Sequence, residues 1–363
     1  MSRLHVVTGK GGTGKTTVAA ALALALAEAG KRTLLVEVEG RQGIAQLFET
    51  EALPYEERKI AVAPGGGEVY ALAIDAEKAL LEYLQMFYKL GSAGRALQRI
   101  GAIDFATTIA PGVRDVLLTG KACEAVRRRV RGGGPFVYDA VVMDAPPTGR
   151  ITRFLGVNSE VAGLARVGPV HHQAQAVMRV LKSPETAVHL VTLLEEMPVQ
   201  ETVDGVAELR GAGLPVGAVV VNLVRPAVLD AAGVERAEDA RTELAEAFAG
   251  AGLGGAKRGG RAHRLVGPLL QQAREHAERV TLEADQRKAI AELGLPTREL
   301  PLRWDGVDLA ALYDLAASLR AQGVDGMSAH ASPRASDRDS AGGRDSASDR
   351  DSGNDRDSEG AGA

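Results

Sequence analysis

The stretch Val6-Val7-Thr8-Gly9-Lys10-Gly11-Gly12-Thr13-Gly14-Lys15-Thr16-Thr17 decides the fold of this chain. An apolar segment runs into glycines and a long Ala/Leu segment follows, so the order of residue types predicts a strand, a loop and a helix. Such a loop directs backbone N–H groups at one point, where a polyanion binds. The spacing G-x-x-x-x-G-K-T is typical of a phosphate-binding loop, in which Lys15 reaches the β- and γ-phosphates and the Thr16 hydroxyl ligates Mg²⁺. The predicted nucleotide-binding residues of the loop are Gly9, Lys10, Gly11, Gly12, Thr13, Gly14, Lys15, Thr16 and Thr17.

Two apolar segments end in carboxylates, which a magnesium–nucleotide site requires. Segment 138–143 runs into Asp144, which would accept a hydrogen bond from a Mg²⁺-bound water, and a helix cap is its alternative role. Segment 33–38 contains Glu37 and is followed by Glu39, and a strand's period of two puts both carboxylates on one side. The alternative interpretation is that Glu37 and Glu39 are two solvated carboxylates at a strand end. The predicted metal ligands are Thr16, Asp144 and Glu37.

The residues after Asp144 combine rigid and flexible positions. Pro146 and Pro147 restrict the backbone, whereas Gly149 permits it to move, as expected of a segment that senses the γ-phosphate. The predicted switch II segment consists of Asp144, Pro146, Pro147, Thr148, Gly149 and Arg150.

Length and composition exclude several other classes of protein. The chain has 363 residues, of which 45% are hydrophobic, so it can bury a large core. The longest apolar run, 18–27, is too short to span a bilayer, so we expect no transmembrane segment. The N-terminus begins a strand, so we expect no export signal and a cytoplasmic location. The net charge of −4 argues against a specific nucleic-acid partner. The single cysteine, Cys123, excludes an internal disulfide and a thiolate zinc cluster.

Apolar segments rich in Val, Leu and Ile alternate with helical patterns along the chain. The predicted strands are 4–7, 33–38, 69–74, 138–143, 188–193 and 216–221. The clearest predicted helices are 17–29, 200–211 and 309–321. This alternation predicts an α/β fold with a mostly parallel sheet flanked by helices, and with ligands at the carboxyl ends of the strands.

Other regions depart from this alternation. Residues from about 76–131 and 160–184 contain no good strand and predict a helical subdomain, and the Gly/Arg-rich residues 252–261 predict a mobile loop. After residue 326 the composition changes to Ser, Asp, Arg and Gly with a repeated Asp-Arg-Asp-Ser unit, which predicts a disordered tail over 327–363. A solvated tail without a specific partner is favoured over a phosphoserine-regulated or RNA-contacting arm. The sequence therefore predicts one domain, 1–326, and a tail.

Two motifs resemble one family of ATPases. Lys10 gives the loop the form K-G-G-T-G-K-T, in which two lysines bracket the glycines, and this form resembles the deviant Walker A loop. The run D-A-P-P-T-G-R, from Asp144 to Arg150, is similar to the D-T-A-P-T-G-H of the ArsA family, with Arg150 in place of the usual histidine. The resemblance covers about residues 4–321, and residues 101–114 resemble an actinobacterial branch of the family.

The resemblance implies an ATP hydrolase that uses ATP and Mg²⁺ and closes as a dimer when ATP binds. It implies that Lys10 reaches across the dimer to the partner's nucleotide. It also implies that Glu39, which stands where the family has an aspartate, positions the attacking water. The implied catalytic residues are Lys10, Lys15, Glu39 and Asp144.

Further residues extend the resemblance towards the C-terminus. It implies that Asn222, at the end of a predicted strand, reads the adenine edge, although a turn residue is its alternative role. It implies that Pro301 and Leu302 belong to a loop that closes over the adenine. The pair Glu201-Thr202 resembles the family's E-T pair at the start of a helix.

The sequence leaves the partner and the client open. The dimer is either a homodimer or a heterodimer with a related ATPase. Residues 80–90 concentrate aromatic and Met side chains, which fit either an apolar client peptide or ordinary core packing, and core packing is favoured.

Alternative functions also stay open at this point. A weakly catalytic or non-catalytic nucleotide-binding subunit of a heterodimer is the main alternative to the switch ATPase. The engine of an anion pump is the third, and a single cysteine disfavours an arsenite system because that ion requires several thiolates.

Overall fold

The computed structural model describes residues 2–88, 111–164, 169–253 and 260–324. Within these ranges one sheet contains eight strands in the order β3-β4-β2-β5-β1-β6-β7-β8. The strands are β1 (Leu4–Gly9), β2 (Arg32–Glu37), β3 (Arg58–Val62), β4 (Glu68–Ala73), β5 (Ala140–Asp144), β6 (Thr186–Thr192), β7 (Val216–Val224) and β8 (Thr297–Pro301). Neighbouring strands are parallel, except that β3 runs antiparallel to β4. The predicted α/β class with a mostly parallel sheet is confirmed.

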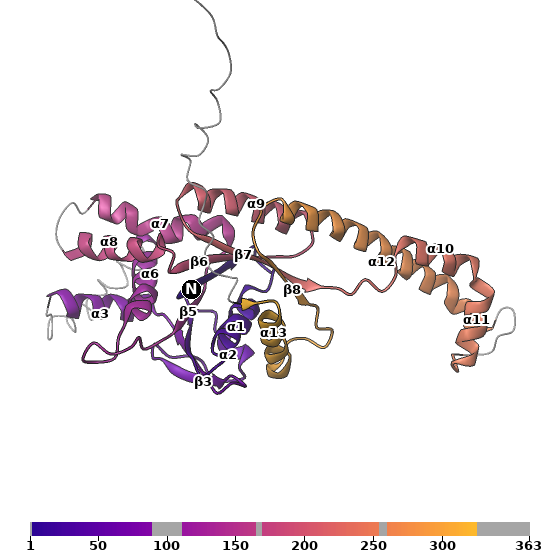
Figure 1. Cartoon of the computed structure of the whole chain (residues 1–363), viewed down its shortest axis with the longest axis horizontal. Helices are drawn as coiled ribbons and strands as arrows, with labels where there is room; N and C mark the ends of the chain where they lie inside the picture. The colour runs from indigo at the N-terminus through magenta and orange to yellow at the C-terminus, as the bar shows by residue number, and fades with distance from the viewer. Residues whose placement is uncertain (1, 89–110, 165–168, 254–259, 325–363) are drawn as a thin grey trace, which may run out of the picture. The chain divides into compact units, whose positions relative to one another are not determined.

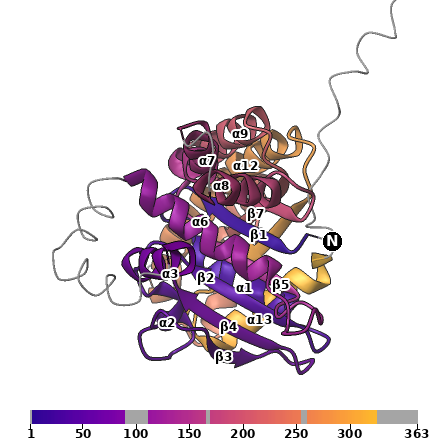
Figure 2. The same ribbon diagram turned by 90° about the vertical axis from the view of Figure 1, so that its left-hand side faces the viewer.

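Helices cover both faces of the sheet (Figures 1 and 2). One layer contains α6 (Pro111–Arg127), α7 (Thr148–Leu164), α8 (Pro169–Leu181) and α9 (Glu196–Gly211). The opposite layer contains α1 (Lys15–Leu26), α2 (Gly43–Leu47) and α13 (Leu309–Ala321). Alternate strand residues divide between the two cores: Leu34 and Val36 pack into the first, Leu35 into the second. Such a strand must be apolar on both faces, which is why the sequence pattern reveals it.

The helix α1 is buried because it lies between the sheet and α13. Its residues from Val18 to Ala25 are all buried, and a helix that is apolar around its whole circumference needs neighbours on every side. It begins at Lys15, directly after the phosphate loop, rather than at residue 17. The loop is thereby attached to the most protected helix of the domain.

The helical region next to the sheet includes α3 (Ala76–Tyr88) as well as α6, α7 and α8. The predicted client segment 80–90 overlaps α3, and its residues 89–90 lie outside the described residues. So do residues 101–110 of the segment that resembles one branch of the family, residues 254–259 of the predicted loop, and the predicted tail 327–363. Among the described helices, none combines the length and apolar character that crossing a bilayer requires.

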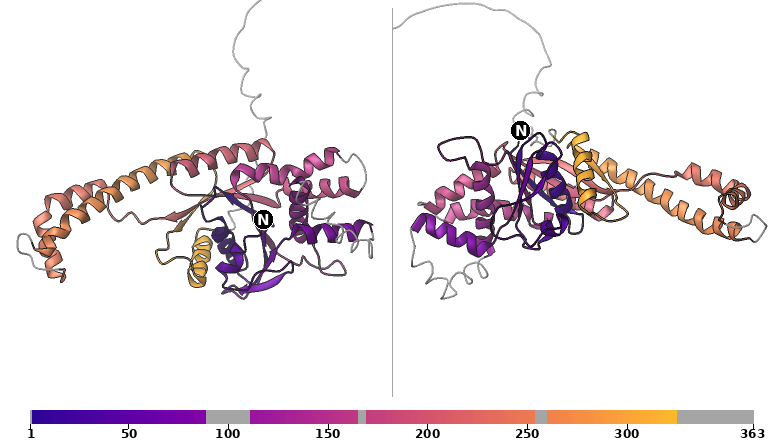
Figure 3. Two further views of the ribbon diagram at one scale, coloured as in Figure 1. Left: turned by 180° about the vertical axis from the view of Figure 1, so that it is seen from behind. Right: turned by 90° about the horizontal axis from the view of Figure 1, so that it is seen from below.

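Three helices between β7 and β8 share a small core of their own (Figures 1 and 3). These are α10 (Ala231–Asp239), α11 (Arg241–Gly250) and α12 (Arg261–Ala291), and α10 and α11 pack against α12. Ala245, Val266 and Leu270 form their small core. The sequence interpretation predicts neither these helices nor the strands β3 and β8.

Two histidines on central strands form a buried chain of hydrogen bonds. The Ala218 N–H donates to His189 Nδ1 over 3.1 Å, and His5 Nε2 lies 3.2 Å from the Ser2 carbonyl, which can only accept. His189 Nε2 therefore donates to His5 Nδ1 over 3.0 Å, and each ring nitrogen has one role when both rings are neutral. Gly217 makes room for the His189 ring, since a Cβ at residue 217 would lie 2.6 Å from His189 Cε1. Burial lowers the pKa of His5 to about 4 and lowers the pKa of His189 as well.

We expect this pair to make the stability of the fold fall in mild acid. The folded-state pKa lies below the unfolded one, so unfolding takes up protons, and stability is full above the unfolded value of about 6.5 and falls as the pH decreases below it. Between pH 7.5 and 5.0 His5 should remove about 2 kcal/mol from the free energy of unfolding, and His189 acts in the same direction. Urea unfolding at the two pH values measures this loss. His5→Gln should reduce the loss by about 2 kcal/mol. Exposed His172→Gln serves as the control, and an unchanged loss in His5→Gln contradicts the assignment.

Candidate functional site

The phosphate loop joins β1 to α1, and two of its glycines are required by close approach. A Cβ at Gly9 would lie 2.2 Å from the Val191 carbonyl oxygen of β6. Gly14 precedes α1 with a φ of +83°, and a Cβ there would lie 2.4 Å from Asn222 Nδ2. Gly12 also has a positive φ of +88°, whereas Gly11 has open space around it. The glycines thus bring the loop backbone against β6 and β7.

Asn222, on β7, contacts the phosphate loop through its side-chain amide. Its Nδ2 donates to the Thr13 carbonyl oxygen over 2.9 Å, and Asn222 itself is buried. Thr13 in turn donates from Oγ1 to the Lys10 carbonyl oxygen over 2.9 Å. In this structure Asn222 therefore stabilises the loop, and its contact with an adenine stays a prediction.

Lys15 and Thr16 begin α1 directly after the phosphate loop. Lys15 Nζ donates to the Lys10 carbonyl oxygen over 3.4 Å. Burial lowers the pKa of Lys15, and the carboxylates of Asp144 and Glu39 oppose that shift. Thr16 Oγ1 donates to Asp144 Oδ2 over 2.6 Å. Thr17 follows in the first turn of the same helix.

The carboxylates of Glu37 and Asp144 lie at the ends of adjacent strands, because β2 pairs Glu37 with Asp144 of β5. Burial raises the pKa of Asp144 to about 6; the Thr16 hydrogen bond and Lys15 lower it, and Glu37 and Glu39 raise it further. Glu37 Oε1 accepts from the Gln42 N–H, whereas its Oε2 is buried without a hydrogen-bond partner among the described residues. A buried, unpaired carboxylate oxygen beside a second carboxylate is an arrangement that a hard divalent cation satisfies. Within the described ranges no three His, Cys, Asp or Glu side chains converge tightly enough to bind a metal ion without further ligands.

Glu39 lies just beyond β2 and close to the same group of charges. Its carboxylate forms an ion pair with Arg41 at 3.6 Å, and Arg41 is largely exposed. Gly43, which opens α2, lies against Thr16, because a Cβ there would be 3.2 Å from Thr16 Cγ2. The segment after β2 therefore contacts the start of α1.

The predicted switch II segment connects β5 to α7. Thr8 Oγ1 donates to the Pro146 carbonyl oxygen over 2.7 Å, which joins the first proline to β1. Pro147 accepts at its carbonyl oxygen from the Arg150 N–H over 2.8 Å, and Thr148 and Gly149 open α7. The exposed Arg150 guanidinium lies 4.0 Å from Asp115 of α6. The segment thus connects the loop region with the helical layer.

One contact of the site is absent from the sequence interpretation. Lys10 Nζ forms an ion pair with Glu201 Oε1 of α9, and Glu201 Oε2 accepts from the Thr148 hydroxyl over 3.2 Å. One glutamate therefore connects the first lysine of the loop to switch II. The Glu201-Thr202 pair noted in the sequence is the signal that could have revealed it.

Pro301 and Leu302 lie at the carboxyl end of β8. Pro301 ends β8 and pairs with Val224 of β7, and the Leu302 N–H donates to the Val224 carbonyl oxygen over 2.8 Å. Leu223 has a positive φ of +56° between Asn222 and this pair. Both residues are thus near the end of the strand that carries Asn222, and their contact with adenine stays a prediction.

Comparisons with known proteins agree with the geometry. The family model of the anion-transporting ATPases matches residues 2–182. The ATPase BagA of Mycobacterium tuberculosis is 54% identical over 322 residues, which cover 89% of this chain and 94% of that protein. The arsenical pump-driving ATPase of Escherichia coli is 28% identical, over 67% of this chain and 44% of that protein. The ATPase GET3 of Kluyveromyces lactis is 29% identical, over 45% of this chain and 50% of that protein.

Proposed function

We propose that this chain, which belongs to the ArsA family of anion-transporting ATPases and hydrolyses ATP, works as a switch. Its dimer closes when ATP binds and opens after hydrolysis. The observation that carries the proposal is the link from Lys10 through Glu201 to Thr148. It gives the lysine predicted to cross the dimer a second, intramolecular partner that also touches switch II.

The Lys10–Glu201 ion pair is weak enough to exchange. Its two side chains are 31% and 36% exposed, and ion pairs of this kind contribute at most about 1 kcal/mol. The phosphates of a partner's nucleotide carry more negative charge than one carboxylate, so they compete well for the Lys10 ammonium. Release of Glu201 then changes the surroundings of Thr148, at the start of α7. Through this helix the nucleotide state reaches the helical layer, where a partner or an apolar client peptide would bind.

The proposed hydrolysis is a direct in-line attack of water on the γ-phosphate. Lys15 and the partner's lysine neutralise the charge that develops on the phosphates, and Glu39 positions the water. Thr16, Asp144 and Glu37 are the residues that would hold Mg²⁺, whose charge supports the same phosphates. The unpaired Oε2 of Glu37 and the acidic pair at the strand ends fit this cation.

A second candidate, a slow subunit in a heterodimer with a related ATPase, draws support from Glu39. Glutamate is one methylene longer than the family's aspartate, and the Glu39 carboxylate is already paired with Arg41. Both features weaken its hold on a water. An arsenite pump has less support because the single cysteine, Cys123, is buried and burial raises the pKa of its thiol to about 12.

Light scattering coupled to size-exclusion chromatography tests the switch. We expect the purified chain to become a dimer with Mg²⁺, ADP and aluminium fluoride but not with ADP alone, and Glu201→Gln to dimerise at a lower nucleotide concentration because Lys10 is no longer held by a carboxylate. Glu208→Gln, on the same helix, is the matched control. A chain that stays monomeric alone but dimerises and releases phosphate with a related ATPase supports the second candidate. If the oligomeric state does not depend on the nucleotide, either for the chain alone or with the related ATPase, the switch is contradicted.

A further inference from the structure

A cavity of about 570 Å³ opens on the helical side of the domain, lined by residues outside the predicted nucleotide site. It is bounded by the segment before β3 and by residues of α3, α6, α7 and α8. Its volume is in the range of cavities that bind small organic molecules. We propose that this cavity binds a small organic cation, namely an apolar body that carries a protonated amine.

The apolar part of the lining accounts for the body of such a ligand. It comes from one strand, β4, and from the helices α3, α6 and α8, and its members are Leu72, Ala79, Val116, Leu117 and Val177. Gly120 of α6 adds no side chain, and a Cβ there would have no neighbour within 4 Å. A hydrocarbon group can therefore lie against the helix itself.

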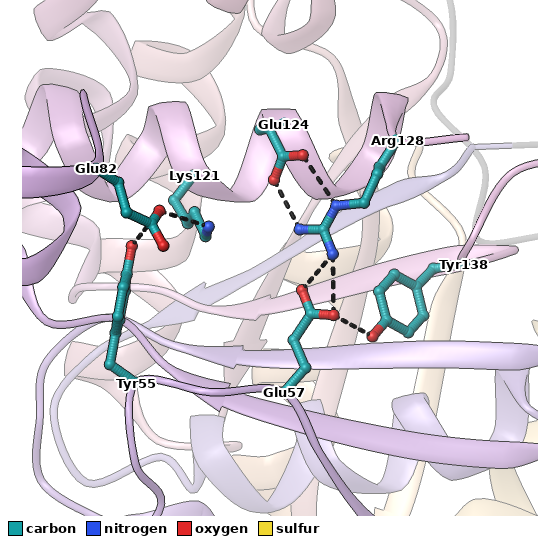
Figure 4. A network of polar contacts seen from close by, with 7 residues as sticks. All are labelled: Tyr55, Glu57, Glu82, Lys121, Glu124, Arg128 and Tyr138. Carbon is teal, nitrogen blue, oxygen red and sulfur yellow. Dashed lines mark hydrogen bonds and ion pairs between the residues drawn. The ribbon is translucent and has the colours of Figure 1, made fainter. Parts of the chain in front are cut away.

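The polar wall is a network of fixed side chains (Figure 4). The Arg128 guanidinium donates to Glu124 with its Nε and to Glu57 with its Nη1, over 2.9 and 2.7 Å. Tyr138 donates to the same Glu57 carboxylate over 2.6 Å. These contacts join α6, the segment before β3 and Tyr138, which lies two residues before β5. The two carboxylates already pair with the guanidinium, so Arg128 is less available to an anionic ligand.

The lining carries an excess of negative charge. Its four glutamates are Glu56, Glu57, Glu82 and Glu124, and its two cations are Lys121 and Arg128, which leaves a formal charge of −2. Glu82 Oε2 accepts from Tyr55 over 2.9 Å and from Lys121 over 2.8 Å, while Glu82 Oε1 has no partner within the described ranges. Because the Glu82 side chain is 48% exposed, an ammonium group could replace water at this oxygen, and it would reduce the charge excess.

A buried amide supplies a second, independent acceptor. Asn158 of α7 lines the cavity, is 0% exposed, and donates from Nδ2 to Thr119 Oγ1 over 2.8 Å. Thr119 donates its own hydroxyl proton to the Asp115 carbonyl oxygen over 2.7 Å, so it accepts from Asn158, and the amide orientation follows. Asn158 Oδ1 is then left without a hydrogen-bond partner among the described residues. A buried acceptor without a partner is unfavourable, and an N–H donor of a ligand would satisfy it.

Calorimetry and ligand-detected NMR on the full chain test the proposal with matched probes of different charge. The cationic probes are phenethylamine and octylamine, the neutral probe is phenethyl alcohol, and the anionic probes are phenylacetate and octanoate. We expect the amines to bind, the alcohol to bind more weakly, and the carboxylates not to bind. Glu82→Gln should weaken the amines about tenfold and leave the alcohol unchanged, because it removes charge but keeps an acceptor.

A cavity-filling variant locates the binding. Gly120→Leu places a side chain in the open space without removing any hydrogen bond, and it should raise the stability of α6 because glycine is a poor helix residue. It should weaken amine binding at least about tenfold. Gly156→Leu on α7 is the matched control, since that glycine also has open space but does not line this cavity. Equal binding of amines and carboxylates, no amine binding at all, or amine binding that Gly120→Leu leaves intact overturns the proposal. Because the readout is binding, the proposed ATPase switch can fail without affecting it.

Discussion

Lys15→Ala is expected to abolish ATP binding and with it ATP hydrolysis. Lys15 is the cation at the start of α1, and among the residues that the structure describes its Nζ donates to the Lys10 carbonyl oxygen alone. Burial already lowers the pKa of Lys15, so the ammonium gains when phosphates replace water around it. Charge-assisted hydrogen bonds to two phosphates contribute roughly 3–6 kcal/mol, so affinity should fall at least about 100-fold. A titration with a fluorescent ATP analogue measures the loss.

The fold should tolerate this substitution. Alanine is the best helix former, and no side chain in the described part of the chain depends on Lys15 for a hydrogen bond. The thermal midpoint without nucleotide should therefore change little. Lys31→Ala, at an exposed position before β2, is the matched control and should bind ATP as the wild type does. Full ATP affinity in Lys15→Ala would place the nucleotide elsewhere.

The central part of the fold could be predicted because its strands are apolar on both faces. β1, β2, β5, β6 and β7 are central or near-central strands, and their side chains alternate between two buried layers. The edge strand β3 has the sequence Arg-Lys-Ile-Ala-Val with only intermediate or exposed side chains, so it lacks this signal. β8, at the opposite edge, contains an arginine, a glutamate and a proline. Edge strands bury less apolar surface, and composition alone therefore conceals them.

The helices between β7 and β8 were missed for a different reason. α12 is 31 residues long but rich in charged residues and interrupted by Pro268, which normally ends or kinks a helix. Its residues are mostly polar and its apolar contacts with α10 and α11 are few, so little apolar sequence marks the helix. A long polar helix with small apolar contacts gives little pattern to detect.

Some residues of the candidate site could be predicted from local sequence, whereas others depend on the fold. Local motifs predict Lys15, Thr16 and Asp144, because a strand–loop–helix and a strand end position them. Glu201 is 191 residues from Lys10, and only the pairing of β1 with β6 and the helix that follows β6 brings the two together. Spacing in the sequence cannot reveal such a contact. The orientation of Asn222 towards Thr13 likewise depends on β7 and β1 meeting across β6.

Lys10→Ala is expected to bind ATP but lose hydrolysis. In the structure its ammonium contacts Glu201 rather than the protein groups around Lys15, so its loss should change ATP affinity little. If Lys10 acts on the partner's nucleotide, turnover should fall roughly 1,000-fold, as for other cations supplied in trans to phosphoryl transfer. Phosphate release and analogue binding separate the two effects. Unchanged turnover would contradict the cross-dimer role.

Mixing two inactive variants distinguishes a lysine that acts in trans from one that acts in cis. Lys15→Ala cannot bind ATP but still carries Lys10, whereas Lys10→Ala binds ATP but lacks the crossing lysine. In a mixed homodimer the Lys10→Ala subunit holds ATP next to an intact Lys10 from its partner, so random mixing restores about a quarter of the sites. Recovered phosphate release therefore requires that Lys10 acts across a homodimer. If activity returns only when wild-type related ATPase is added instead, the crossing lysine comes from that subunit, and if neither mixture recovers, Lys10 acts within its own chain.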